Sequence, residues 1–259
     1  MNDIKIFFFD VDYTSFDHSI FAVRESTMNG LRQLKEKGYK LYVCTSRSYD
    51  EMRNIPKDFM NLMNGFITLA GSYIIREGEA SYSTIDRDDL EKGLKYFREN
   101  DLPYRYATND GKGYMSHDLR DVNDAFYVLY HMVPELKEYE GEEVVHILYY
   151  SHNDSDEDNV KKIFKKESHN SFGNPYEIMP PGVDKGEAAL RIAESYGYTR
   201  ENICAFGDSN NDLTLLKMAG LGIAMGNGSK EAKECADYVT DDISDEGLYN
   251  ALKKFGFVD

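Results

Sequence analysis

Short apolar segments alternate with amphipathic ones toward both ends of the chain. The segments with the β-branched and aromatic content of buried strands are residues 4–9, 40–46, 65–71, 202–209 and 221–226. Apolar residues recur at helical spacing in residues 26–37, 185–197, 210–220 and 246–256. Strands that alternate with helices predict an α/β fold with a doubly wound parallel sheet, to which both ends of the chain contribute.

The middle of the chain is richer in tyrosine and in charged residues. Helical patterns at residues 88–100 and 156–168 alternate with hairpin-like stretches at residues 73–85 and 104–117 and with strand patterns at residues 143–151 and 174–180. This mixture predicts a small α+β domain inserted into the larger one. We therefore expect a catalytic core built from residues 1–78 and 182–259, and an inserted domain built from residues 79–181.

The charge balance excludes some classes of partner. The formal net charge is −16, whereas binding to nucleic acid or to an anionic membrane surface needs clustered Lys and Arg. No apolar run approaches the roughly 18 residues of a membrane span. The three cysteines show neither disulfide nor CxxC metal spacing, and the first residues lack the pattern of a signal peptide. We expect a cytoplasmic protein with reduced cysteines, and the sequence does not indicate its oligomeric state.

Polar residues gather directly after the predicted strands, where an α/β sheet presents functional groups. They are Asp10, Asp12 and Thr14; Thr45, Ser46 and Arg47; Lys185; and the stretch GDSNND at residues 207–212. Each of these alone reads more readily as a turn former, since Asp, Asn and Gly commonly follow strands. Together they make one consistent reaction centre.

The chemistry of these groups favours transfer of a phosphoryl group. Asp10 is expected to attack phosphorus, and Asp10 with Asp208 to bind a hard cation such as Mg²⁺. Lys185 and the Thr45 hydroxyl would hold the transferring oxygens, and Asp12 would protonate the leaving oxygen and later activate water. Asn211 or Asp212 would orient metal-bound water or Lys185.

At these residues the chain resembles the haloacid dehalogenase (HAD) superfamily of phosphohydrolases, and its long insert is similar to that of the Cof-type subfamily with a type IIB cap. The resemblance rests on DVDYT, CTSR, GVDKG, GDSNND and the tail LGIAMGNG, which occur in the family's order and spacing. It implies a Rossmann-like core and a Mg²⁺-dependent phosphatase that forms an aspartyl phosphate on a small phosphorylated metabolite, such as a sugar phosphate. It also implies roles for several residues: a backbone-carbonyl metal contact from Asp12, substrate binding by Thr14, Ser46, Arg47 and Asn211, and a supporting role for Asp212.

Two positions depart from the family pattern. Tyr13 stands where relatives usually carry Gly, so the loop after the second aspartate must accept a side chain. Ala70 stands where relatives often carry Asn before a Gly, so a polar contact to substrate or loop is missing. Both changes bear on the substrate and leave the carboxylates of the reaction centre in place.

Other interpretations remain open at this point. A phospho-aspartate signalling receiver also uses acidic residues with a Thr and a Lys, but an insert of this size has no role in one. A catalytically silent binding protein does not need the intact set of Asp10, Asp12, Lys185 and Asp208. The insert tyrosines, including Tyr104 and Tyr106, either stack on the substrate or pack against the insert's own helices, and packing is the commoner role. The six histidines show no zinc spacing.

Overall fold

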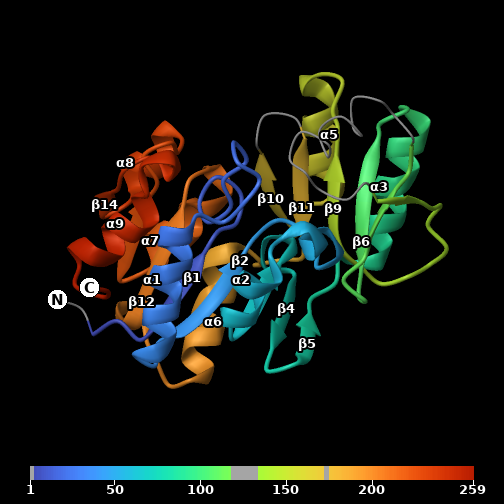
Figure 1. Ribbon diagram of the computed structural model, residues 1–259. Helices are drawn as coiled ribbons and strands as arrows, with labels where there is room; N and C mark the ends of the chain where they lie inside the picture. Colours follow the sequence, from blue (N-terminus) through green and yellow to red (C-terminus); the bar gives the residue numbers. More distant parts are fainter. Residues whose placement is uncertain (1–2, 118–133, 172–174) are drawn as a thin grey trace.

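Eight strands form the sheet that organises the larger part of the molecule (Figure 1). The computed structural model describes residues 3–117, 134–171 and 175–259. In spatial order the strands are β14 (Tyr238–Val239), β13 (Leu221–Ala224), β12 (Ile203–Gly207), β1 (Ile6–Phe9), β2 (Lys40–Cys44), β3 (Gly65–Thr68), β4 (Tyr73–Arg76) and β5 (Glu79–Tyr82). The pairings from β14 to β3 are parallel, and β4 and β5 add an antiparallel hairpin at one edge. The predicted α/β fold with a parallel sheet is confirmed.

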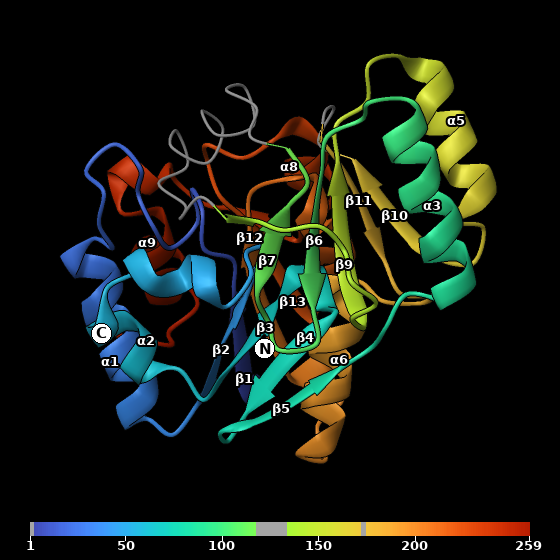
Figure 2. The same cartoon turned by 90° about the vertical axis from the view of Figure 1, so that its right-hand side faces the viewer.

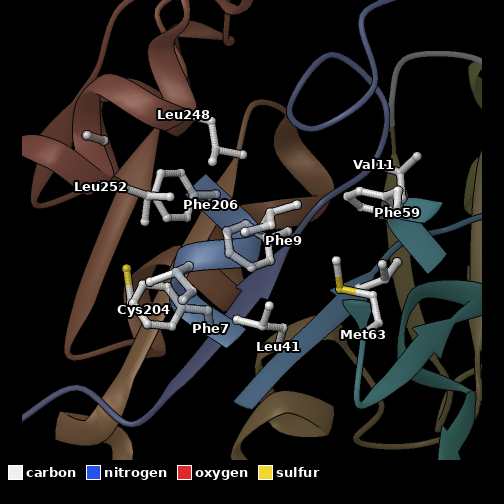
Figure 3. Packing of buried hydrophobic residues seen from close by; sticks show 14 of the residues in the cluster. Phe7, Phe9, Val11, Leu41, Phe59, Met63, Cys204, Phe206, Leu248 and Leu252 are labelled. Carbon is white, nitrogen blue, oxygen red and sulfur yellow. The ribbon is translucent and has the colours of Figure 1, made fainter. Parts of the chain in front are cut away.

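Alternate residues of β1 point to the two faces of this sheet, as strand geometry requires. Phe7 and Phe9 pack in a cluster with the helices on one face, and Ile6 and Phe8 pack in a second cluster on the other. The first face is covered by α1 (Glu25–Glu36), α2 (Lys57–Leu62) and α9 (Gly247–Lys254); the second by α6 (Lys185–Ser195) and α7 (Leu213–Met218); α8 (Lys230–Cys235) packs beside α7. Figure 3 shows Leu41, Phe206 and Leu252 around the two β1 phenylalanines. The strand that delivers Asp10 is thus fully buried on both sides.

In the described residues the insert is a second, mostly antiparallel sheet with two helices on one face (Figure 2). Its strands, in spatial order, are β10 (Ser168–Ser171), β11 (Tyr176–Met179), β9 (Val144–Tyr149), β6 (Tyr104–Thr108), β7 (Gly113–Met115) and β8 (Glu135–Leu136). The helices are α3 (Arg87–Glu99) and α5 (Asp154–Ile163). Tyr104 and Tyr106 are 5% and 0% exposed and belong to the cluster under these helices. These tyrosines therefore have the packing role and not the stacking role.

The boundary of the insert differs from the sequence expectation. Residues 79–82 were assigned to the insert, but β5 pairs with β4 in the eight-stranded sheet. The hairpin itself is as expected, and it joins the core because β4 pairs with β3. We propose that the insert starts after Tyr82. Residues 118–133 and 172–174 of the predicted insert lie outside the described residues.

The face of the insert sheet opposite α3 and α5 faces the core. Leu69 of the core packs with Ala107 and Val145 of the insert, and Ala70 packs with Met179. Strand β10 lies against η4 (Asn210–Asp212), which follows β12. In the parts of the chain that the structure describes, no helix is both long enough and apolar enough to span a membrane. The insert thus covers the edge of the core sheet at which the predicted reaction centre lies.

The contact between α3 and Phe164 gives a prediction about the stability of the insert. A Cβ added at Gly93 would lie 2.1 Å from the Phe164 ring, which is fully buried. Gly93→Ala gains about 1 kcal/mol of helix propensity, but the overpacked ring costs about 1–3 kcal/mol, so we expect a lower free energy of unfolding. Urea unfolding measures the difference.

Two further variants serve as controls. Lys95→Ala, on the exposed face of the same helix, should stay within about 0.5 kcal/mol of the parent. Phe164→Leu, introduced into the Gly93→Ala protein, should restore part of the lost free energy of unfolding, since it removes the ring atoms that clash. A Gly93→Ala protein that is more stable than the parent would contradict the packing described here.

Candidate active site

Three adjacent strands end at the centre of the site. The register pairs Phe9 of β1 with Val43 of β2 and with Phe206 of β12, so the residues that follow these strands lie side by side. These residues are Asp10, Thr45 and Asp208, and each is at least nine-tenths buried. The amide of Asp10 donates to the Phe206 carbonyl over 3.0 Å, which fixes the start of the loop. The parallel sheet therefore brings together residues that are nearly 200 positions apart.

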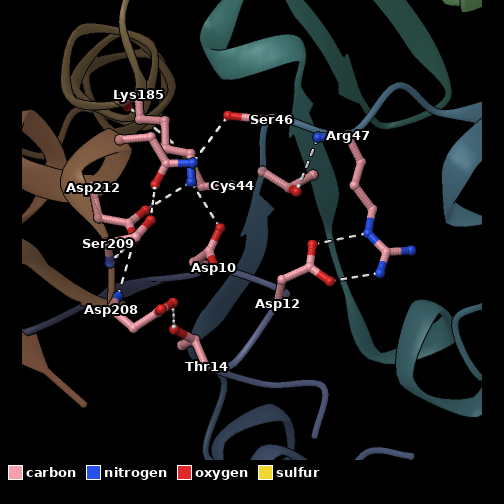
Figure 4. A network of polar contacts seen from close by, with 12 residues as sticks. Asp10, Asp12, Thr14, Cys44, Ser46, Arg47, Lys185, Asp208, Ser209 and Asp212 are labelled. Carbon is pink, nitrogen blue, oxygen red and sulfur yellow. Dashed lines mark hydrogen bonds and ion pairs between the residues drawn. The ribbon is translucent and has the colours of Figure 1, made fainter. Parts of the chain in front are cut away.

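Lys185 reaches this edge from the first turn of α6. Asp184 caps the helix by accepting a hydrogen bond from the Glu187 amide, and this starts the helix at Lys185. The Lys185 ammonium donates to Asp10 Oδ1 and to Asp212 Oδ1, both over 2.7 Å, and the side chain is 1% exposed (Figure 4). One buried cation is thus shared by two carboxylates.

Asp212 and Thr14 hold Asp208 in place. The second oxygen of Asp212 accepts hydrogen bonds from the backbone amides of Asp208 and Ser209, over 3.0 and 3.1 Å. Thr14 Oγ1 donates to Asp208 Oδ1 over 2.9 Å. Both oxygens of Asp212 are therefore engaged by the chain itself, and its part is to orient Lys185 and the turn that carries Asp208.

The centre holds more negative than positive charge. Carboxylate oxygens of Asp10, Asp208 and Asp212 lie within 4.8 Å of one another, and Lys185 is the cation that contacts them among the described residues. Burial and the neighbouring Asp212 raise the pKa of Asp10 well above its usual value, and the same causes raise the pKa of Asp208 to about 7. Burial opposes the charge on Lys185, but Asp10 and Asp212 outweigh it and raise the lysine pKa.

This donor set fits a hard divalent cation. Carboxylate oxygens are the ligands that Mg²⁺ takes in proteins, and a dication would offset the uncompensated charge that raises the pKa values of Asp10 and Asp208. Asp10 and Asp208 are the residues whose carboxylates would contact it. Asp212 belongs to the same cluster by distance, but its oxygens already accept from Lys185 and from two amides.

Asp12 lies beside Asp10 but has different partners. Arg47 holds it with two hydrogen bonds, Nε to Oδ2 over 2.9 Å and Nη2 to Oδ1 over 2.6 Å (Figure 4). His18 Nε2 also lies 2.6 Å from Asp12 Oδ1, and the centre of the histidine ring lies 4.6 Å from that of Tyr13, with the two rings tilted by 34°. Sequence reasoning missed His18, because a lone histidine in a polar loop gives no signal of its own.

The remaining predicted residues lie around these carboxylates. Asn211 donates to Ser46 Oγ over 3.0 Å and accepts from Ser209, so its amide bridges two loops. The Thr45 hydroxyl accepts from the Arg47 amide over 3.2 Å. Arg47 was expected to bind substrate, but its side chain is 1% exposed and its guanidinium is turned to Asp12. The structure therefore gathers all the predicted site residues at this edge, with Arg47 buried behind Asp12.

Backbone strain accompanies both departures from the family pattern. Tyr13 has φ 59° and Ala70 has φ 54°, in the left-handed region that favours Gly or Asn. The Tyr13 amide donates to the Phe16 carbonyl over 3.0 Å, and its carbonyl accepts from Asn227 over 2.8 Å. The Ala70 amide donates to the Thr45 carbonyl over 3.1 Å. These hydrogen bonds keep the conformation that the loops need, although the side chains there disfavour it.

Comparison with known proteins gives a consistent result. Over residues 7–252 the sequence matches the family of haloacid dehalogenase-like hydrolases. The protein YkrA of Bacillus subtilis is 26% identical over 263 residues, 99% of each chain. The 5-amino-6-(5-phospho-D-ribitylamino)uracil phosphatase YcsE of the same organism is 24% identical over 97% of this chain and 95% of its own.

A solved structure extends the likeness to the insert. The HAD subclass IIB sugar phosphatase BT4131 superposes with a TM-score of 0.91 at 24% identity, over 98% of this chain and 100% of that one, which shows a common fold. The resemblance drawn from the motifs is confirmed. The chain therefore belongs to the haloacid dehalogenase-like hydrolases, and its insert has the fold of the insert in the subclass IIB structure.

Proposed function

We propose that this enzyme is a Mg²⁺-dependent phosphatase that hydrolyses a small phosphorylated metabolite through an aspartyl phosphate on Asp10. The observation that carries the proposal is the buried contact of Lys185 with Asp10, next to the carboxylate of Asp208. A nucleophilic carboxylate can approach a phosphate dianion only where positive charge offsets the repulsion. Lys185 supplies part of that charge, and Asp10 and Asp208, with the backbone carbonyl of Asp12, would hold a cation that supplies more.

Each side chain has a defined task in this reaction. A carboxylate oxygen of Asp10 forms a bond to phosphorus while the bond from phosphorus to the leaving oxygen breaks, and Asp12 gives that oxygen a proton. Water then attacks phosphorus as Asp12 accepts its proton, which releases inorganic phosphate and restores Asp10. Lys185 and Thr45 hold the oxygens of the transferring group, and Ser46, Asn211 and Thr14 shape the pocket around it. Asp10 and Asp208 would hold a cation that, when bound, would neutralise charge on those oxygens.

A phosphorylated sugar or a similar polyol is the substrate class that we propose. It is supported by the activities for which the relatives are named, which include a phosphatase of a ribitylamino compound and a sugar phosphatase. Free cysteines agree with a reducing compartment, and we place the enzyme in the cytoplasm. Steady hydrolysis of p-nitrophenyl phosphate with Mg²⁺, abolished by EDTA, would separate this function from a receiver or a silent binding protein.

The first test of the mechanism concerns Asp10 and Asp12. Asp10→Asn removes the nucleophile and should abolish turnover of every phosphate ester, whatever its leaving group. Asp12→Asn should lower turnover of an alkyl phosphate by about 10²–10⁴-fold, because an alkoxide needs the proton that p-nitrophenolate scarcely needs.

The same variants predict where the covalent intermediate forms. With p-nitrophenyl phosphate, Asp12→Asn should accumulate phosphate on Asp10, since the water that cleaves the intermediate is no longer activated. Rapid-quench mass spectrometry locates the adduct. Phosphate on Asp12, or turnover by Asp10→Asn, would refute these roles.

A second test concerns the cation. Because the raised pKa of Asp208 means that the cation-free site takes up a proton near neutral pH, Mg²⁺ must displace that proton. The Mg²⁺ concentration at half saturation should therefore rise as pH is lowered through about 7. Asp208→Asn should weaken binding at least about tenfold and flatten this pH dependence. Calorimetric titration measures both, and an unchanged affinity would remove Asp208 from the site.

A further inference from the structure

A continuous set of contacts leads from Asp12 through the core to the insert. Arg47 contacts Asp12, the turn η1 (Asp50–Asn54) contacts Arg47, and Arg105 of the insert contacts Glu51 of that turn. We propose that Arg47 is a positioning residue for Asp12 and that Arg105, acting through Glu51, fixes this position only when the insert is docked on the core. The inference rests on the proposed function, since it assigns a task to Asp12 as the proton donor.

The guanidinium of Arg47 is fixed from two sides. Nε and Nη2 hold the two oxygens of Asp12, while Nη1 donates to the Glu51 carbonyl over 2.9 Å and to Asn54 Oδ1 over 2.8 Å. A planar guanidinium held in this way transmits a shift of the turn directly to its other partner. The orientation of the Asp12 carboxylate therefore depends on where η1 lies.

The side chain of Glu51 links the turn to the insert. Its Oε2 accepts a hydrogen bond from the Ser48 amide over 2.6 Å, and its Oε1 lies 2.9 Å from Arg105 Nη2. The Glu51 and Arg105 side chains are 5% and 2% exposed. Among the described residues neither Nε nor Nη2 of Arg105 makes a hydrogen bond of regular geometry, and Glu51 Oε1 makes none either. The ion pair between Glu51 and Arg105 is therefore the contact that compensates the charge of this buried arginine.

The insert is built to admit this arginine. Arg105 lies on β6 opposite Met115 of β7, and Gly113 lies two residues before Met115 on the same strand. A Cβ on Gly113 would lie 2.7 Å from Arg105 Nη2 and 2.8 Å from Nε, so glycine leaves the space that the guanidinium occupies. The absence of a side chain at this position supports a specific place for Arg105, beyond a general attraction between two domains.

Undocking the insert would leave Glu51 without its cation. A buried carboxylate that loses its partner is strongly disfavoured, and without Arg105 the insert no longer holds η1 in this position, so we infer that the turn shifts as Glu51 becomes hydrated. Arg47 would then lose two of its acceptors and with them its fixed orientation toward Asp12. Proton transfer to the leaving oxygen is in this way restricted to the docked state, in which the substrate is covered.

The experiment compares two esters of similar size whose leaving groups differ in basicity. Phenolate is a much stronger base than p-nitrophenolate, so phenyl phosphate depends more on Asp12. Arg105→Met should lower kcat/KM for phenyl phosphate about tenfold more than for p-nitrophenyl phosphate, as expected when a catalytic group is displaced. Glu51→Gln, which keeps the size of the side chain, should change the ratio in the same direction, and Arg105→Lys should recover part of it. Thermal unfolding confirms that each variant is folded.

Two comparisons make the result specific. Tyr82→Phe removes a different contact between core and insert, the hydrogen bond from the Tyr82 hydroxyl to Glu143, and should leave the ester ratio unchanged. In an Asp12→Asn background, Arg105→Met should no longer change the ratio. A ratio change that persists there, an equal loss for both esters, or the same change in Tyr82→Phe would overturn the inference while the phosphatase mechanism stands. If Asp12→Asn itself leaves the ratio unchanged, the role of Asp12 fails, and the inference fails with it.

Discussion

The buried ammonium of Lys185 is the contact on which the arrangement of the site depends. It touches Asp10 and Asp212 at equal distances, and without it these carboxylates would repel each other across a region of low dielectric. Its place at the first residue of α6 is set by the Asp184 cap and by the packing of that helix on the sheet. The position of the ammonium is therefore set by the whole core. It offsets part of the negative charge of the centre, and a bound cation would offset more of it.

The loops around the site have a strained backbone. Tyr13, Leu69 and Ala70 all have positive φ, which costs about 1 kcal/mol or more for each residue that is not glycine. The two buried clusters on either side of β1 offset such costs many times over, because they contain most of the apolar side chains of the core. The loops keep their shape since backbone hydrogen bonds and the packed sheet hold both of their ends.

The insert contributes to the site by contact as well as by cover. The face of its sheet opposite α3 and α5 packs on the loop at Leu69 and Ala70, and its buried Arg105 reaches the turn that holds Arg47. The inward orientation of the Arg47 side chain is thus explained by its contacts with this turn. An arginine in a motif that follows a strand of the site suggests a bound anion, but here the anion that Arg47 contacts is the carboxylate of Asp12. The core and the insert together orient the second aspartate, whereas the core alone orients the first.

The sequence by itself determined which residues gather at the centre and the class of fold. Apolar runs that end in Asp10, Thr45 and Asp208 can form buried parallel strands in few ways, and parallel strands bring such residues to one edge. Lys185 was also predicted from the sequence, because a lysine at the start of a helical pattern is enough to mark it as a candidate site residue. Local pattern also gave the hairpin at residues 73–85, but not the sheet that it joins, since pairing with β3 is a long-range choice.

Only the tertiary structure decided the partners of the charged side chains. His18, Glu51, Asn54 and Arg105 carry no recognisable pattern, and the roles of the last three follow from Arg47 being turned inward. Nor could the sequence distinguish a tyrosine that faces the core from one that faces α3 and α5, because both alternate along a strand in the same way. Side-chain direction and ion pairing across domains depend on how two sheets are docked, and that is settled by packing over the whole molecule.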